Sequence, residues 1–119
     1  MLHFNNGTFK IMQIADIQED YPVNPDTVKL ITLALEKEKP DLVVLTGDQI
    51  QAYSSCYFKD GERKIGEVIN SFLTPMEERN IPFCVTFGNH DAEAYSYFDR
   101  KAVSEIYSDE DFKFCLFQP

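Results

Sequence analysis

Basic residues are scarce in this sequence. Of its 119 residues, 11 are lysine or arginine and 20 are aspartate or glutamate, so the formal net charge is -9. A protein that wraps nucleic acid through phosphate contacts needs a basic face, and the composition argues against that function class. This argument does not exclude a nucleotide that is held through metal ions.

Cysteines are few, and long apolar runs are missing. Cys56, Cys84 and Cys115 form no CxxC pair, which disfavours a cysteine zinc site or a redox motif. Their odd number and the missing secretory leader are typical of the reducing cytoplasm, where we expect the protein to act. No apolar run approaches the ~18 residues that a helix needs to cross a bilayer, so we expect no membrane span.

The composition favours one globular domain over residues 1–119. Hydrophobic residues make up 44% of the chain and include ten Phe and six Tyr, which is enough for a real core. Disordered chains have a lower apolar content and often contain low-complexity segments, and this sequence has neither property.

Three apolar runs predict β-strands at residues 10–15, 41–46 and 81–86. The apolar residues run continuously, most clearly in the second strand, and this pattern indicates strands that are buried on both faces of a parallel sheet. A fourth apolar run predicts a further strand at residues 112–117.

Two long helical patterns separate these strands. The first begins at Asn24-Pro25, because Asn caps free backbone N–H groups and Pro suits the first helical position, and it ends at Lys39. An apolar stripe predicts the second helix over residues 61–79. Pro75 lies inside this stripe and predicts a kink or break near residues 71–74.

Two other segments are predicted from weaker patterns. Residues 99–107 are expected to form a short helix. The long connection at residues 49–60 has a length that is often functional in compact domains. Its aromatic residues, Tyr53, Tyr57 and Phe58, are expected to pack the loop onto the rest of the domain.

The order strand–helix–strand–helix–strand (βαβαβ) predicts an α/β fold with a parallel sheet, right-handed crossovers and flanking helices. In such sheets, ligands bind beyond the carboxyl ends of the strands. Asp16, Asp48 and the group Asn89-His90-Asp91 all fall at those ends. A dinucleotide site is disfavoured because no GxGxxG follows the first strand.

The polar residues at these strand ends have the chemistry of a metal site. Asp16, Asp48 and Asn89 offer hard oxygen ligands, which suit manganese, magnesium, calcium or ferrous iron. His90 beside them can bind a metal or transfer protons. Two metals ~3.5–4 Å apart can clamp a phosphate ester and activate a water.

These motifs resemble the calcineurin-like metallophosphoesterase family. Asp16-Ile17-Gln18 corresponds to the first family motif, Gly47-Asp48 to the second and Gly88-Asn89-His90-Asp91 to the third, in the same order and with similar spacing. The resemblance implies a four-layer α/β/β/α fold, of which the βαβαβ unit is half. It also implies two divalent metal ions (Mn, Mg, Fe, Zn or Ca) and a phosphoester substrate such as a nucleotide or a phospholipid.

The resemblance also implies a role for each motif residue. Asp16 would bind the first metal, Asp48 would bridge both metals, and Asn89 would bind the second. His90 would contact the substrate phosphate and stabilise or protonate the leaving oxygen, and Asp91 would orient His90. A hydroxide activated by the two metals would attack phosphorus in line, so catalysis would be mainly positioning and charge neutralisation.

Two positions depart from the family patterns. The usual first motif is Asp-x-His, whereas this sequence has Gln18 at the third position. The amide oxygen of Gln18 can ligate a hard cation, but it is a weaker ligand than imidazole, so we expect more tolerance of magnesium or calcium. Purple acid phosphatases place a metal-binding Tyr at the position of Gln51, so that subclass is disfavoured. The Asp-Arg-Gly of protein Ser/Thr phosphatases is also absent after Gly47-Asp48.

The later metal ligands of the family are missing from this sequence. They include a Gly-His-x-His motif, whereas the chain has only His3 and His90. We therefore interpret residues 1–119 as the truncated N-terminal portion of a phosphoester hydrolase, and we expect the chain alone to be inactive. Its uncovered apolar surface predicts a homo-oligomer. The alternative is a non-catalytic half-domain that associates with itself.

Overall fold

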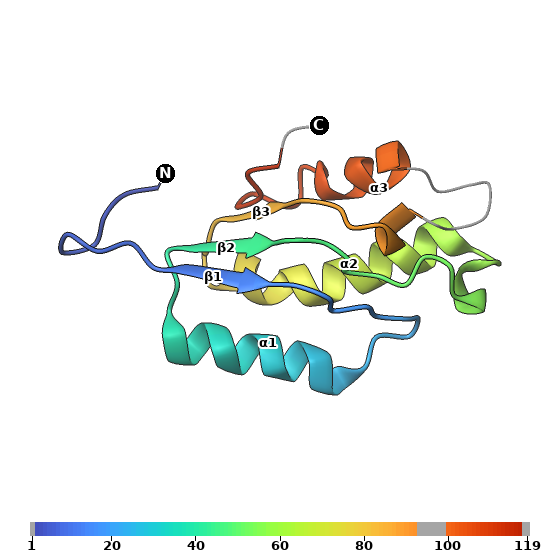
Figure 1. Ribbon diagram of the computed structural model, residues 1–119, viewed down its shortest axis with the longest axis horizontal. Helices are drawn as coiled ribbons and strands as arrows, with labels where there is room; N and C mark the ends of the chain where they lie inside the picture. The colour runs from blue at the N-terminus through green and yellow to red at the C-terminus, as the bar shows by residue number, and fades with distance from the viewer. Residues whose placement is uncertain (1, 93–99, 118–119) are drawn as a thin grey trace.

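A three-stranded parallel sheet forms the centre of the fold in the computed structural model, which describes residues 2–92 and 100–117 (Figure 1). The strands are β1 (Ile11–Ile14), β2 (Leu42–Leu45) and β3 (Phe83–Val85). They are ordered β1-β2-β3, so β2 is central and β1 is an edge. Ile11 pairs with Leu42, and Val43 pairs with Phe83. The predicted α/β fold with a parallel sheet is therefore confirmed.

Two long helices cover one face of this sheet. They are α1 (Pro25–Glu38) and α2 (Gly61–Glu78), and they pack against each other. The core lies between α2 and the strands, where side chains such as Ile69, Phe72 and Val43 are fully buried. Because successive strand residues point to opposite faces, this arrangement buries alternate residues of each strand.

The other face of the sheet is less covered than the sequence predicted. Ile11 is 57% exposed, and Leu42, Val44 and Cys84 are only partly buried. The expectation that the strands are buried on both faces is therefore wrong for the described residues. The physical reason is that consecutive strands in the order β1-β2-β3 place both long helices on the same side.

The predicted capping of α1 is confirmed. The side chain of Asn24 accepts a hydrogen bond from the backbone N–H of Asp26 at 2.9 Å, and Pro25 occupies the first turn. The helix ends at Lys39, which adopts a left-handed conformation and donates its N–H to the carbonyl of Leu35. Such a left-handed residue satisfies a carbonyl that the helix end leaves free.

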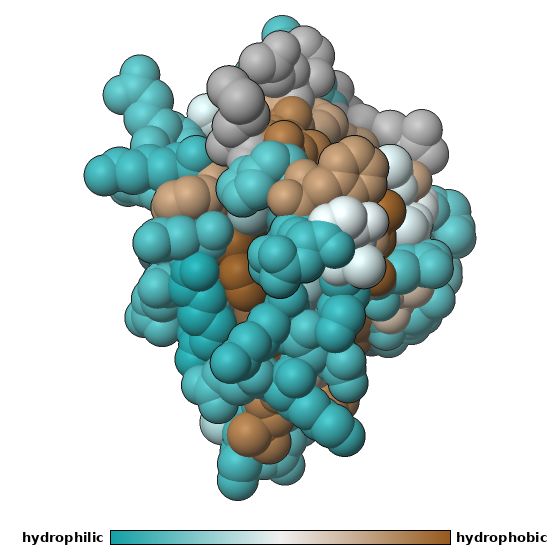
Figure 2. All heavy atoms as spheres, turned by 90° about the vertical axis from the view of Figure 1, so that its left-hand side faces the viewer, coloured by the Kyte–Doolittle hydropathy of each residue, from teal (hydrophilic) through white to brown (hydrophobic). Residues whose placement is uncertain are grey.

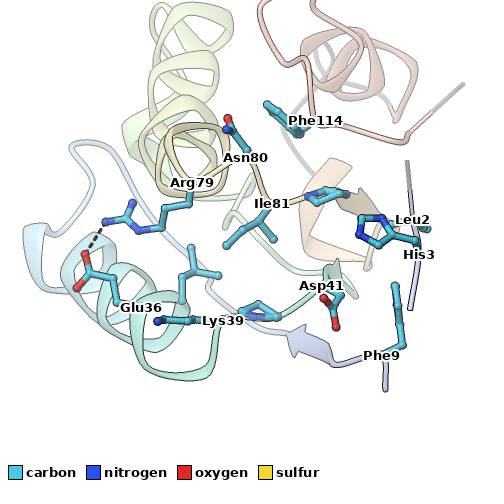
Figure 3. A pocket seen from close by; sticks show the side chains of 13 residues that line it. Leu2, His3, Phe9, Glu36, Lys39, Asp41, Arg79, Asn80, Ile81 and Phe114 are labelled. Atoms are coloured by element: carbon cyan, nitrogen blue, oxygen red, sulfur yellow. Dashed lines mark hydrogen bonds and ion pairs between the residues drawn. The ribbon is translucent and has the colours of Figure 1, made fainter. Parts of the chain in front are cut away.

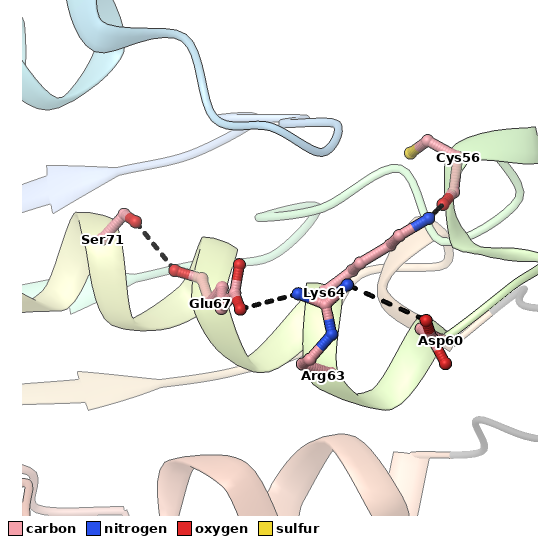
Figure 4. Close-up of polar contacts among 6 residues, drawn as sticks. All are labelled: Cys56, Asp60, Arg63, Lys64, Glu67 and Ser71. Atoms are coloured by element: carbon pink, nitrogen blue, oxygen red, sulfur yellow. Dashed lines mark hydrogen bonds and ion pairs between the residues drawn. The ribbon is translucent and has the colours of Figure 1, made fainter.

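The first turn of α2 is fixed by side chains that reach neighbouring segments (Figure 4). Lys64 donates to the backbone carbonyl of Cys56 at 2.9 Å. Arg63 pairs with Glu67 one turn further on at 2.8 Å, and more loosely with Asp60 at 3.9 Å. These contacts connect the helix to the loop that precedes it.

Of the kink or break expected near residues 71–74, the break is wrong, because the helix continues through Pro75 to Glu78. Pro75 lies on the buried face of the helix, whose apolar stripe packs into the core. We attribute the continuity to this packing, which offsets the hydrogen bond that proline cannot make. On the solvent side, Ser71 and Thr74 donate their hydroxyls to carbonyls four residues earlier.

The C-terminal region matches the prediction only in part. α3 (Arg100–Tyr107) corresponds to the helix predicted at 99–107. The strand predicted at 112–117 is wrong, since this segment is irregular, with a turn at residues 113–114 and a single bridge at Cys115. It meets β3 at one bridge, where Phe83 donates its N–H to Phe114 at 3.0 Å and accepts from Leu116 at 2.7 Å.

A cavity of about 590 Å³ lies at the end of the sheet where the strands begin (Figure 3). Its lining includes Phe9, Ile81 and Pro82, and an ion pair between Arg79 and Glu36 at 2.7 Å closes one side. Figure 2 views this end and shows apolar surface between hydrophilic side chains. The predicted site residues lie at the opposite end.

Among the described residues, no helix combines the length and apolarity needed to cross a bilayer.

Candidate active site

Two loops run side by side at the carboxyl ends of β1 and β2. Asp16 donates its backbone N–H to the carbonyl of Gly47 at 3.1 Å, and Gln18 donates to Asp48 at 2.9 Å. In Figure 1 the strands point to the end where these loops and the short helical turn at residues 90–92 lie. The sheet topology therefore brings the first two predicted motifs together.

Asp48 contacts the third motif as well. Its Oδ1 accepts the backbone N–H of His90 at 2.9 Å, while its backbone carbonyl accepts from Gln18. The side chain of Asp48 thus lies beside the loop after β3, and its backbone lies beside the loop after β1. Among the predicted site residues, Asp48 has the central position.

Two glycines allow the loops after β2 and β3 to approach closely. A Cβ atom added to Gly88 would lie 2.1 Å from Oδ1 of Asp48, which is far inside van der Waals contact. A Cβ atom added to Gly47 would lie 2.6 Å from the backbone nitrogen of Gly88. Gly47 also has a φ of 121°, a value that glycine adopts far more readily than other residues. The short distance between Asp48 and the third motif therefore depends on glycine.

Three of the predicted metal ligands have left-handed backbone conformations. The φ angles are 56° at Asp16, 49° at Gln18 and 54° at Asp48. For residues other than glycine, this conformation costs free energy and is concentrated at functional sites. Its recurrence on two adjacent loops indicates that the loops are shaped to place these side chains.

The carboxylate of Asp91 connects the loops after β2 and β3. Asp91 is 1% exposed, and its two oxygens accept backbone N–H groups from four residues. The donors are Asp48 at 2.8 Å, Gln49 at 2.8 Å, Ile50 at 3.3 Å and Gly88 at 2.7 Å. Burial raises the pKa of Asp91, and these amide hydrogen bonds oppose part of the rise. These four bonds position backbone and do not involve the His90 ring, whose orientation the sequence analysis assigned to Asp91.

The ring of His90 lies against Tyr53. Their ring centroids are 5.0 Å apart with a tilt of 58°. Nδ2 of Asn89 lies 3.4 Å from Nδ1 of His90, a distance at the long end for a hydrogen bond. The sequence identifies Tyr53 as a loop aromatic. It does not predict that Tyr53 contacts His90, because no spacing rule connects the two positions.

The other two loop aromatics behave differently from each other. Tyr57 is buried and donates its hydroxyl to the carbonyl of Glu19 at 2.9 Å, so the expected packing is confirmed for this residue. Phe58 is exposed, and the same expectation is wrong there. Burial raises the pKa of Tyr57 far above its ordinary value, so its hydroxyl remains protonated and can keep donating.

The side chain of Gln18 forms a chain of hydrogen bonds with two neighbours. Its Nε2 donates to Oδ1 of Asp16 at 3.2 Å. Its Oε1 accepts from Nε2 of Gln51 at 3.1 Å. Gln18 and Gln51 depart from two separate family patterns in the sequence. The structure shows that their side chains are hydrogen-bonded to each other.

The donor set fits a hard divalent cation in its chemistry. Asp16, Asp48 and Asn89 present carboxylate or amide oxygens from three loops at one edge of the sheet. Within residues 2–92 and 100–117, however, no three His, Cys, Asp or Glu side chains converge on one point. The described residues therefore form no complete metal site by themselves.

The calcineurin-like phosphoesterase family model matches residues 9–117. This match covers most of the chain and includes all three motifs. The chain belongs to the calcineurin-like phosphoesterase family. The fold agrees with this assignment, since its sheet and flanking helices form an α/β half-domain of the kind found in metallophosphoesterases.

Similar calcineurin-like phosphoesterases differ in what their names say about activity. Phosphatase DCR2 of Saccharomyces cerevisiae is 33% identical, over 97% of this chain and 21% of that protein. Probable inactive purple acid phosphatase 29 of Arabidopsis thaliana is 32% identical, over 82% of this chain and 27% of that protein. Probable inactive purple acid phosphatase 28 of the same plant is 29% identical, over 76% of this chain and 25% of that protein. The chain thus spans about a quarter of the length of these relatives.

The purple acid phosphatase name contrasts with the sequence pattern, which disfavours that subclass because Gln51 stands at the position of a metal-binding Tyr. Two of the similar proteins carry the subclass name together with the word inactive. The family assignment rests on the match of the family model to residues 9–117 and does not depend on these names.

Replacing Asp91 with Asn is expected to lower the free energy of unfolding by about 2–4 kcal/mol. An amide has one acceptor oxygen in place of two, and its NH2 group would face backbone N–H donors. Urea unfolding followed by circular dichroism measures the change. Asp111→Asn, on an exposed turn, is the matched control and should shift the free energy by less than about 0.5 kcal/mol. Equal effects of the two changes would contradict the connecting role of Asp91.

Replacing Gly88 with Ala is expected to lower the free energy of unfolding by about 1–3 kcal/mol, because the new methyl group displaces the Asp48 carboxylate. The matched control is Gly66→Ala in α2, where an added Cβ meets no atom within 4 Å. That change should stabilise the protein by about 0.5–1 kcal/mol through helix propensity. Thermal unfolding of both variants tests the prediction, and a stable Gly88→Ala protein would contradict it.

Proposed function

We propose that this chain provides one wall of the active site of a metal-dependent phosphoester hydrolase. The observation that supports this most strongly is the position of Asp48, which contacts the loop of Asp16 through its backbone and the loop of Asn89 and His90 through its carboxylate. A residue that lies between two other loops with proposed ligands is a suitable candidate for a bridging ligand. Membership of the calcineurin-like phosphoesterase family supports the same reaction class.

The proposed metal-holding roles are those that the family resemblance implies, and the donor chemistry of these residues supports them. Asp16 would bind one divalent ion, Asn89 would bind the second, and Asp48 would lie between them. When bound, such ions neutralise phosphate charge and lower the pKa of a coordinated water. The left-handed backbone of Asp16 and Asp48 is a conformation that is concentrated at functional sites, which supports a role for these two residues.

His90 would handle the substrate. Its imidazole would contact a phosphate oxygen and donate a proton to the leaving oxygen as the ester P–O bond breaks and the water oxygen bonds to phosphorus. Tyr53 packs against this ring and would limit its rotation. Asp91 would act as a positioning residue, since its carboxylate accepts the backbone N–H groups of Asp48 and of Gly88, which lies two residues before His90.

The substrate class proposed is a small phosphoester, such as a nucleotide or a phospholipid headgroup. The remaining metal ligands would come from outside the described residues, because Asp16, Asp48 and Asn89 are too few for two ions. We also propose that the protein acts in the reducing cytoplasm, in agreement with the three free cysteines.

A second candidate function is a non-catalytic half-domain that associates with itself. Two observations favour it: the partly exposed second face of the sheet and the word inactive in the names of similar proteins. The two functions differ in whether the site binds metal and in whether association depends on the sheet face.

The hydrolase proposal predicts that the chain binds Mn²⁺ through Asp48. Asp48→Asn is expected to weaken Mn²⁺ affinity by at least about 10–100-fold, the loss seen even for partners of metal ligands. Electron paramagnetic resonance of free Mn²⁺ measures the affinity, and Asp111→Asn is the control. Bis-p-nitrophenyl phosphate with Mn²⁺ should not be hydrolysed by this chain alone. Unchanged Mn²⁺ binding in Asp48→Asn would contradict the proposal.

The self-association proposal predicts a dimer or larger oligomer at tens of micromolar in sedimentation velocity. Ile11→Glu, on the exposed sheet face, should shift the protein toward monomer, because it places a charge where apolar surface would be buried. Leu30→Glu is the matched control, since Leu30 is 69% exposed on α1, away from that face. A monomeric unmodified protein, or equal effects of both changes, would count against association through the sheet.

A further inference from the structure

Gln18 and Gln51 form a pair beside the proposed metal ligand Asp16. Members of the family with an Asp-x-His motif have histidine at the position of Gln18. Purple acid phosphatases have tyrosine at the position of Gln51. In this chain both positions carry an amide, and the two amides are hydrogen-bonded to each other at 3.1 Å. The following inference rests on the proposed function and concerns how this pair controls metal binding.

The orientation of the two amides decides which atoms face the metal side. Gln51 donates Nε2–H to Oε1 of Gln18, so the only ligating atom of Gln18 faces Gln51. Gln18 in turn points Nε2–H at Oδ1 of Asp16 at 3.2 Å. An N–H group cannot ligate a cation. In this orientation, Gln18 therefore occupies part of the space around Asp16 without contributing a ligand.

The backbone keeps the two side chains next to each other. Gln18 donates its backbone N–H to Asp48 at 2.9 Å, and Gln51 donates its own to Glu19 at 3.1 Å. Residues 19 and 50 also pair as a parallel bridge. Because both backbones are held, the two amides stay within reach of each other, and rotation about the terminal bond of either side chain exchanges the positions of its oxygen and nitrogen.

We propose that Gln51 is a specificity-determining residue that sets the metal affinity of the site at Asp16. A cation at Asp16 that takes Gln18 as a second ligand would require Gln18 to turn its amide, so that Oε1 faces the metal and Nε2 faces Gln51. Gln51 must then turn as well, since two N–H groups would otherwise meet. Metal binding is thus coupled to a joint rotation of both amides, and the rotated pair offers a hard oxygen that suits Mg²⁺ or Mn²⁺.

The test replaces Gln51 with Met, which has a similar length, carries no charge and does not donate a hydrogen bond. Freed from Gln51, Gln18 can turn its oxygen toward the metal at the cost of one hydrogen bond, to Asp16, instead of two. We expect Mn²⁺ affinity to rise about tenfold, the equilibrium factor that corresponds to one net hydrogen bond. Electron paramagnetic resonance of free Mn²⁺ provides the readout, which is independent of activity.

Gln13→Met is the matched control. Gln13 also donates Nε2–H across the β1–β2 pair, to Oγ1 of Thr46 at 3.1 Å, so the same substitution removes a hydrogen bond of the same length. Its Mn²⁺ affinity should equal that of the unmodified protein. In a Gln18→Met background, Gln51→Met should no longer raise the affinity, because the oxygen that it frees is absent.

The outcomes separate this inference from the proposed function. A tenfold gain in Gln51→Met that disappears in the double variant supports the coupled amides. If Mn²⁺ binds and is lost in Asp48→Asn, but Gln51→Met has no effect, the inference is overturned and the proposed function stands. If the unmodified protein and all variants fail to bind Mn²⁺, both are overturned. A gain that persists without Gln18 would assign the effect to Gln51 alone and would also overturn the coupling.

Discussion

The carboxylate of Asp91 is the constraint on which the arrangement of this site depends. Two β-strands end side by side, and the loops that leave them have backbone amides that cannot pair with each other. Asp91 accepts four of these amides while it is almost completely buried. Leaving such buried donors without an acceptor costs free energy, so the loops are stable only in the arrangement that Asp91 provides. The position of Asp48, and with it the proposed metal centre, follows from that arrangement.

The sheet is covered well on one face only, and the proposed site has residues on one side only. Both long helices pack on one face, which leaves side chains such as Ile11 and Val44 partly exposed on the other. At the carboxyl edge, the loops that carry the proposed ligands would likewise provide only part of a coordination sphere. A parallel sheet with strands in consecutive order produces the first property, because right-handed connections direct both helices to the same side. The described residues thus cover the second face of the sheet only in part, and they supply only some of the ligands that the proposed metal site needs.

Much of the fold could be predicted from the sequence, because local signals agree with the packing. Asn24 and Pro25 start α1 as expected, and the apolar stripe of α2 is the face that enters the core. The failures occur where packing overrides a local signal. Pro75 does not break its helix, because the buried stripe on either side holds the helix together. The apolar run at 112–117 is not a strand, because its pairing with β3 is limited to one residue.

The sequence by itself determined which chemical groups stand at the strand ends, because motif residues follow apolar runs and parallel strands bring their carboxyl ends to one edge. Only the tertiary structure decided how these groups are connected. The bond between Gln18 and Gln51 joins residues 33 positions apart, and Asp91 bonds to residues more than 40 positions away. Hydrogen bonds of this kind have no period or spacing in the sequence. They exist because the folded sheet places two loops within reach of the same side chain.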